Sequence, residues 1–153
     1  RSLIAQRNQI KDRAVALVKD PPDYQRLTSL SGIGPINALT ILAEAGELRR
    51  FGRHRQFLKF CGMDFATIQS GTFHGQTKRS KYGNARLRRT LWMAGQVAIV
   101  QRINSFRDTF ERYIAKDRHN KHLRRKAYTA IATKMARTVP GIIKHGEPDL
   151  PLL

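Results

Sequence analysis

The chain has 153 residues, of which 41% are apolar, and this composition fits one domain with a buried core and excludes disorder throughout. Lys and Arg number 29 against 11 Asp and Glu, a formal net charge of +18. The excess points to a polyanionic partner, nucleic acid above all, because each neutralised phosphate releases counterions. An anionic membrane surface is the weaker alternative, since there is no long apolar span and no lipidation motif. Cys61 is the single cysteine, which excludes a disulfide framework and favours a reducing, intracellular compartment.

The first predicted element is a helix that ends at the Asp-Pro-Pro run of residues 20–22. Leu3, Ile10 and Leu17 recur every seven residues and form one apolar stripe along it. The stripe either packs on the domain's own core or marks residues 1–20 as the end of a long linker or coiled coil. Because the chain begins inside this helical pattern, we expect it to be a piece of a longer protein.

Three shorter helices are predicted next, over residues 23–30, 35–46 and 52–62. Gly46 is expected to form the C-cap of the second helix. The third is expected to bury its apolar side, which carries Phe57, Leu58 and Cys61. Residues 62–82 show little periodicity and contain glycines, so this segment is predicted to be a loop.

Helical patterning dominates the rest of the chain. Three further helices are predicted, with Asn84, Ser105 and Asn120 as their N-caps. The last of them is expected to end at Pro140-Gly141, and residues 146–153 are expected to form a loose tail. No alternation of strand type is present, so the fold is predicted to be all-α, mostly or wholly helical.

The turn Gly32-Ile33-Gly34-Pro35 joins two predicted helices within residues 24–46. Both glycines can take a positive φ, and Pro35 suits the first position of a helix. The free N–H groups and the dipole at the start of that helix suit a phosphate oxygen. The turn resembles a helix-hairpin-helix motif, which binds a nucleic-acid backbone without reading bases. The alternative is an ordinary helix–helix turn in which the glycines only save space.

Ser70 precedes a glycine and a dense run of cations: Lys78, Arg79, Lys81, Arg86, Arg88 and Arg89. Such a cluster can bind phosphates and offset the charge that develops when a phosphodiester is attacked. A serine hydroxyl attacks phosphorus only when a base, a metal or a nearby cation activates it. From spacing alone, Ser-Gly is more typical of a turn than of a nucleophile.

Other aromatic, histidine and acidic residues have weaker functional interpretations. Trp92 and Met93 have apolar neighbours and are predicted to be core residues rather than a platform for base stacking. His119 and His122 have a metal-ligand spacing, but the adjacent cations favour a basic surface that faces nucleic acid. His74 can serve as a general base, but the preferred interpretation is a solvated loop residue. The acids are scattered, so this chain is not expected to assemble a two-metal nuclease site.

The order of motifs resembles the C-terminal domain of a family of bacterial insertion-sequence transposases. The similarity runs from "LTSLSGIGPINALTILAEAGEL" through "FLKFCGMD" and "QSGTFHG" to "SKYGNARLRRTLWMAG". It spans roughly residues 24–98, and a looser helical likeness continues to about residue 137. By this resemblance, residues 21–145 form the transposase C-terminal domain, with the helix-hairpin-helix at 24–46 and a serine loop at 62–82.

Members of this family have a RuvC-like N-terminal half with a DEDD acid set and are guided by a bridge RNA. The resemblance implies that Ser70 is the nucleophile that links the protein to the cut DNA strand. It also implies that the acids and their Mg²⁺ lie outside this chain, and that the full-length protein is a homo-oligomer in the bacterial cytoplasm, associated with the nucleoid. We expect DNA contacts from Gly32, Ile33, Gly34, Lys78, Arg79, Lys81, Asn84, Arg86 and Arg89. The alternative function is a non-catalytic helix-hairpin-helix module that binds DNA or RNA.

Overall fold

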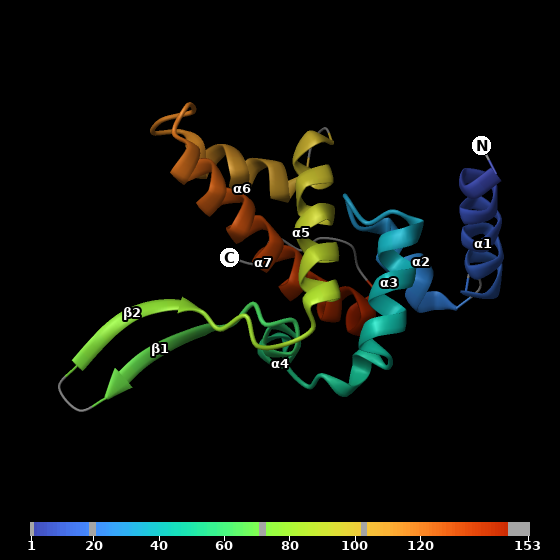
Figure 1. The fold of residues 1–153 in the computed structure, drawn as a ribbon, viewed down its shortest axis with the longest axis horizontal. Coiled ribbons are helices and arrows are strands. Elements are labelled where there is room, and N and C mark those ends of the chain that lie inside the picture. The colour runs from blue at the N-terminus through green and yellow to red at the C-terminus, as the bar shows by residue number, and fades with distance from the viewer. Residues whose placement is uncertain (1, 19–20, 71–72, 102–103, 147–153) are drawn as a thin grey trace.

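The structure, a computed structural model, describes residues 2–18, 21–70, 73–101 and 104–146, with the backbone alone for residues 18, 66–70 and 73–79. Its helices are α1 (Ser2–Val18), α2 (Pro22–Ser29), α3 (Pro35–Ala45), α4 (His54–Phe60), α5 (Ala85–Val100), α6 (Ser105–Ile114) and α7 (Lys121–His145). A short 3-10 helix covers Leu48–Arg50, and two antiparallel strands, β1 (Phe65–Ser70) and β2 (Phe73–Arg79), form a hairpin. The fold is all-α, as predicted, with this hairpin projecting from the helices (Figure 1).

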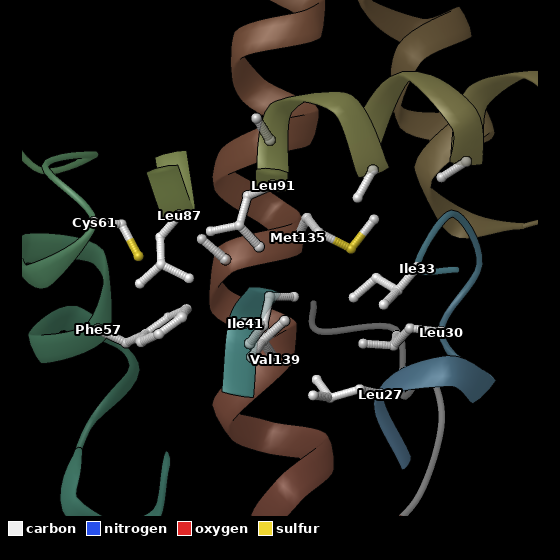
Figure 2. Packing of buried hydrophobic residues seen from close by; sticks show 14 of the residues in the cluster. Leu27, Leu30, Ile33, Ile41, Phe57, Cys61, Leu87, Leu91, Met135 and Val139 are labelled. Carbon is white, nitrogen blue, oxygen red and sulfur yellow. The ribbon is translucent and has the colours of Figure 1, made fainter. Parts of the chain in front are cut away.

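The hydrophobic core lies where α3, α4, α5 and α7 meet (Figure 2). Helices α5 and α7 form its centre, and the turn between α2 and α3 closes one side. Large side chains that are fully buried there include Ile41, Phe57, Leu87, Leu91 and Met135. Burying each of them contributes roughly 1.5–3 kcal/mol, so this junction holds the helices in one arrangement.

The helix caps confirm most of the predicted boundaries. Asn84 caps α5, and its side-chain oxygen accepts a hydrogen bond from the Leu87 N–H at 3.0 Å. Asn120 caps α7 by accepting from two amides of the first turn. Gly46 ends α3 with a φ of 63°, and its N–H donates to the Leu42 oxygen at 3.0 Å. Each of these caps depends on residues within one helical turn.

The predicted N-cap of α6 is wrong by one residue. Asn104, and not Ser105, caps this helix, because its side-chain oxygen accepts from the Arg107 N–H at 2.9 Å. The amide nitrogen of the same side chain donates to the Ala98 oxygen at 2.7 Å. Asn104 is buried and therefore ties α6 to the end of α5, which a serine hydroxyl with its single donor hydrogen and shorter reach does less well.

The predicted end of α7 at Pro140-Gly141 is also wrong. The helix continues to His145 and has Gly146 as its C-cap, with a φ of 73°. Proline inside a helix costs about 3 kcal/mol, because it removes one backbone hydrogen bond and crowds the preceding turn. Here the cost is offset by apolar side chains that are buried beside it: Val139, Ile142 and Ile143.

The prediction that residues 62–82 form a loop is wrong for most of this segment, which contains β1 and β2. Phe65 pairs with Arg79 at the base of the hairpin, and Ser70 pairs with Phe73 next to its tip. The register shifts between Thr67 and Gln69. Alternating apolar and polar residues mark a strand that has one face on the core. The hairpin projects away from the helices (Figure 1), so its strands have no such face and do not need this alternation. That is why periodicity failed to reveal it.

Helix α1 lies beside α3 at the edge of the domain (Figure 1). Leu3, Ile10 and Leu17 are exposed by 80%, 69% and 83%, so the stripe does not pack on this domain's core. Val15 of α1 packs partly against it. Of the two alternatives for this stripe, packing on the domain's own core is therefore wrong. The assignment of residues 1–20 to the end of a linker or coiled coil stays a prediction.

The turn between α2 and α3 depends on a glycine that approaches α5. Gly32 is buried and has a φ of 89°, in the region that L side chains rarely adopt. A Cβ at this position would overlap the Ala94 carbonyl oxygen and lie 2.8 Å from the Ala98 Cβ. Gly32 therefore lets the turn touch α5, and its role is the space-saving one.

We expect Gly32→Ala to lower the free energy of unfolding by about 2 kcal/mol or more, because it combines backbone strain with a clash. Gly34→Ala is the matched control, since a Cβ there meets nothing within 4 Å, and its effect should be limited to about 1 kcal/mol for alanine at an N-cap. Urea unfolding followed by circular dichroism measures both. Equal stabilities of the two variants would contradict the proposed packing role of Gly32.

Candidate nucleic-acid interface

The exposed side of the α2–α3 turn is the start of α3. Gly34 is exposed and is the N-cap residue of α3, but its φ of −85° is ordinary extended backbone. The positive φ that the sequence allows at both glycines is found at Gly32 and not at Gly34. Ile33 is only 3% exposed, so any nucleic-acid contact at this residue would come from its backbone. What the turn offers to solvent is the amino end of α3, where a helix leaves its first N–H groups without helical partners.

The base of the hairpin is held by hydrogen bonds to α4, α5 and the segments beside them. The Ser80 N–H donates to the Asp64 oxygen at 3.0 Å, and the Asn84 N–H donates to the Phe60 oxygen at 2.8 Å. The Arg88 side chain, from α5, donates to the backbone oxygens of Cys61 and Lys81, both at 3.1 Å. Arg88 therefore fastens both ends of the hairpin to α5.

Among the predicted DNA-binding residues at this base are three cations whose side chains the structure describes. Lys81 is exposed and has a φ of 54°, and Arg89 is exposed on α5. Arg86 is also exposed, but it makes an ion pair with Glu44 of α3 at 3.0 Å. Its charge is therefore partly neutralised within the chain, while Lys81 and Arg89 point to solvent at the hairpin base.

Asn84 has a structural role that the sequence did not indicate. Besides capping α5, its side-chain nitrogen donates to Glu44 at 2.7 Å, so it links the start of α5 to α3. The hydrogen bond from Asn84, the hydrogen bond from Arg86 and the charge of Arg86 together hold the pKa of Glu44 below its usual value, against a smaller opposing effect of burial. An ionised Glu44 thus adds a polar connection between α3 and the end of α5 that carries the hairpin.

Trp92 and Met93 are not core residues, so that prediction is wrong. They are exposed by 43% and 48%, whereas Leu91 and Ala94 are buried. The buried positions of α5 follow the helical period, and positions 92 and 93 fall on the other side of the helix. The helical spacing of Leu87, Leu91 and Ala94 indicates which face of α5 is buried and places residues 92 and 93 off that face. The apolar character of Trp92 and Met93 pointed to the core instead. Trp92 is accordingly the candidate functional residue that sequence reasoning missed.

Ser70 is the last residue of β1, and its backbone pairs with Phe73 near the tip of the hairpin. Lys78 and Arg79 pair with Ala66 and Phe65, so their backbones lie toward the base. Five residues of extended strand span roughly 17 Å. The fold therefore does not bring these two cations beside Ser70 through strand pairing. Gly71 and Thr72, which follow Ser70, lie outside the described residues.

Of the remaining candidate residues, His74 lies in β2, and the other two histidines lie away from the hairpin. His119 and His122 are both exposed at the start of α7. His74 pairs, through its backbone, with Gln69. Over the part of the chain that the structure describes, no three His, Cys, Asp or Glu side chains gather as a metal site would require. Among the described helices, none has an apolar stretch that is long enough to span a bilayer.

Comparison with known proteins shows the family. The sequence model of the Transposase IS116/IS110/IS902 family matches residues 24–113, which is more than half of the chain and includes the α2–α3 turn, the hairpin, α5 and most of α6. The chain belongs to this family. The resemblance that the motif order indicated is thereby confirmed.

Two curated relatives carry the same kind of description. The transposase for insertion sequence element IS1111A of Coxiella burnetii is 29% identical over 132 residues, which cover 86% of this chain and 36% of that protein. A probable family 20 transposase of Pseudomonas aeruginosa is 36% identical over 86 residues, which cover 56% of this chain and 25% of that protein. The chain thus spans about a third or less of the length of these relatives.

The Glu44 connection leads to a pH-dependent prediction. Because its folded pKa is lowered from 4.5, Glu44 contributes stability that is present above pH 4.5 and lost as pH falls through the folded pKa. Glu44→Gln should therefore be less stable than the parent chain at pH 7, with the difference shrinking as the pH falls below 4.5. Denaturant unfolding over this pH range measures it.

Asn84→Ser serves as the companion variant, because serine still caps a helix but its shorter side chain lacks the amide that donates to Glu44. It should reproduce part of the same pH-dependent loss. A stability difference between Glu44→Gln and the parent that is constant from pH 7 to pH 3 would contradict the role assigned to the carboxylate.

Proposed function

We propose that this chain is the DNA-binding, nucleophile-carrying C-terminal domain of an insertion-sequence transposase. The observation that carries the proposal is the position of Ser70 near the tip of a projecting hairpin, on a basic domain that belongs to a transposase family (Figure 1). A hairpin of this kind can bring a nucleophile to a phosphodiester of one DNA strand while the helical body stays bound to the phosphate backbone nearby.

In the proposed reaction, the Ser70 hydroxyl attacks the phosphorus of one DNA phosphodiester. A serine–phosphate bond forms, the strand oxygen on the other side of phosphorus leaves as a hydroxyl, and it takes up the proton that the serine gives up. Attack by the 3′ or 5′ hydroxyl so released, or by that of another strand, reverses the step and joins the strands. Because the phosphodiester bond is conserved at each step, no nucleotide cofactor is consumed.

The hydroxyl of Ser70 requires activation, since a serine is a weak nucleophile at neutral pH. Pairing in the hairpin leaves the backbones of Lys78 and Arg79 several residues away from Ser70. The described residues of this chain also do not fit Mg²⁺, because they contain no cluster of suitable ligands. We therefore assign the activating groups, including the Mg²⁺ of the DEDD acid set, to the N-terminal domain of the parent protein.

The helical body is proposed to hold the DNA. The amino end of α3 at Gly34 would accept a phosphate, and Lys81 and Arg89 would neutralise others near the hairpin base. The expected partners of the full-length protein are DNA, a guide RNA and further copies of itself, in the bacterial cytoplasm near the nucleoid. The charge of +18 supports a polyanionic partner for this chain.

Two variants separate a backbone contact from a charge contact in DNA binding. Gly34→Val should weaken binding to unrelated duplexes by a similar factor at every salt concentration, because the side chain blocks approach without removing charge. Arg89→Ala should instead lower the slope of log affinity against log salt by about one. Fluorescence anisotropy with labelled duplexes measures both. Wild-type affinity in a folded Gly34→Val chain would contradict the phosphate contact at α3.

The nucleophile is tested in the full-length parent protein with a nicked DNA substrate. Ser70→Ala should abolish the covalent protein–DNA adduct. Its affinity for DNA should stay within about twofold of that of the parent protein, because the hydroxyl takes part in the reaction and not in DNA binding. Ser80→Ala is the matched control: Ser80 lies at the hairpin base, where its backbone N–H bonds to Asp64, and this variant should retain the adduct. The isolated chain should bind DNA and form no adduct.

Mass spectrometry of the trapped adduct assigns the phosphate to one residue. A phosphate on Ser80 or Thr72 would overturn the assignment of Ser70. Binding with no adduct in the full-length protein under any condition would favour the non-catalytic binding module.

A further inference from the structure

A pocket of about 430 Å³ opens at the base of the hairpin, between α5 and α7. Lys81 contributes to it from the hairpin end, Arg88, Arg89 and Trp92 from α5, and Thr129 from α7. Its volume lies in the lower part of the range of small-ligand pockets, roughly 300–1,000 Å³. The space can hold one nucleotide, and it is too small to admit a double helix.

Trp92 gives the pocket an aromatic wall that is both exposed and fixed. Its side chain is 43% exposed and lines the pocket. Its ring makes a T-shaped contact with the Tyr128 ring, with 6.4 Å between the ring centroids. The centroids of the Tyr128 and Phe110 rings are 5.1 Å apart. This chain of contacts across α5, α7 and α6 restrains the orientation of the indole before any ligand arrives. A restrained aromatic ring suits stacking with a planar base.

The charged residues of the pocket all have the same sign. Lys81, Arg88 and Arg89 line it, and none of its described lining residues is acidic. Arg88 is committed to the backbone oxygens of Cys61 and Lys81, so Lys81 and Arg89 are the exposed cations at the mouth. A phosphate is the anion that occurs next to a planar aromatic group in a nucleic-acid strand. The combination therefore matches one nucleotide, with its base at Trp92 and its phosphate at the cations.

We propose that this pocket binds a single unpaired nucleotide of the DNA strand. The proposal deepens the proposed function, on which it rests, by adding a site that is selective for unpaired DNA to a domain that grips the phosphate backbone. Both faces of a base in a duplex are covered by its neighbours, so a base can stack on Trp92 only after it has left the helix. A strand that is nicked, gapped or unwound near the hairpin supplies such a base.

The tryptophan itself reports on the proposal, because Trp92 is the only tryptophan in the chain. Titration with a short oligothymidylate should quench its fluorescence, whereas a blunt duplex should bind without comparable quenching. Binding is measured in parallel by the anisotropy of the labelled DNA. Equal quenching by the duplex, or stronger quenching by a matched oligouridylate, would overturn the assignment to unpaired DNA.

Variants give a second and independent measurement. Trp92→Leu should weaken oligothymidylate binding by roughly five- to hundredfold, the loss expected for one base–aromatic stack, with little effect on the duplex. Trp92→Phe should restore part of the affinity, because a phenyl ring also stacks. Met93→Leu is the matched control, since Met93 is the next residue of α5, is 48% exposed and is not among the residues that line the pocket. Circular dichroism verifies that each variant is folded.

The outcomes distinguish this proposal from the function on which it rests. Oligothymidylate that binds by anisotropy without quenching Trp92, or with unchanged affinity for Trp92→Leu, would overturn the pocket and leave backbone binding intact. Failure of the chain to bind either form of DNA would overturn both. Quenching limited to unpaired DNA, together with the loss in Trp92→Leu, would establish the site.

Discussion

The close approach of α5 to its neighbours is the constraint on which the rest of this structure depends. Ala94 and Ala98 face the α2–α3 turn, where Gly32 leaves no room for a side chain. On the side toward α7, a Cβ on Gly95 would lie 3.1 Å from a methyl carbon of Ile131, so this contact is also tight. Because small residues occupy these contacts, α5 packs closely against both the α2–α3 turn and α7. Packed interiors tolerate little added volume, and larger residues here would push the turn and α7 away from α5.

The same helix positions the parts that face solvent. Asn84 caps its first turn and joins it to α3 through Glu44, and Arg88 fastens the two ends of the hairpin. Arg89 and Trp92 of the same helix line the pocket at the hairpin base, beside Arg88. The orientation of the hairpin relative to the turn and the pocket is therefore set by one rigid element, and not by flexible connections. A site built on such an element keeps its geometry when a ligand binds.

The proposed division of labour follows from where the groups lie. The cations and the pocket belong to the helical body and the hairpin base, whereas Ser70 is carried near the tip of the hairpin. A nucleophile on a projecting hairpin can reach into the active site of another domain or subunit, but it receives little help from its own helical body. Under the proposed function, this arrangement would limit the reactivity of the isolated domain, since a serine becomes nucleophilic only where other groups activate it.

The sequence by itself determined the helical class, the family and most of the helix ends. Asn84, Asn120 and Gly46 act within one turn of their own helices, and such local hydrogen bonds can be predicted from neighbouring residues. Tertiary structure alone decided that α7 passes through Pro140, because burial of the residues beside it outweighs a local preference.

The hairpin and the pocket likewise depend on contacts between residues that are distant in the sequence. Strand pairing carries Ser70 away from Lys78 and Arg79, although all three belong to one short segment of the chain. The outward position of Trp92 is fixed by which face of α5 meets α7 and the turn. The residue types of a site are therefore visible in the sequence. The distances between these residues depend on strand pairing and helix packing over the whole fold. These contacts join residues that are far apart in the sequence, so a short stretch of sequence does not reveal them.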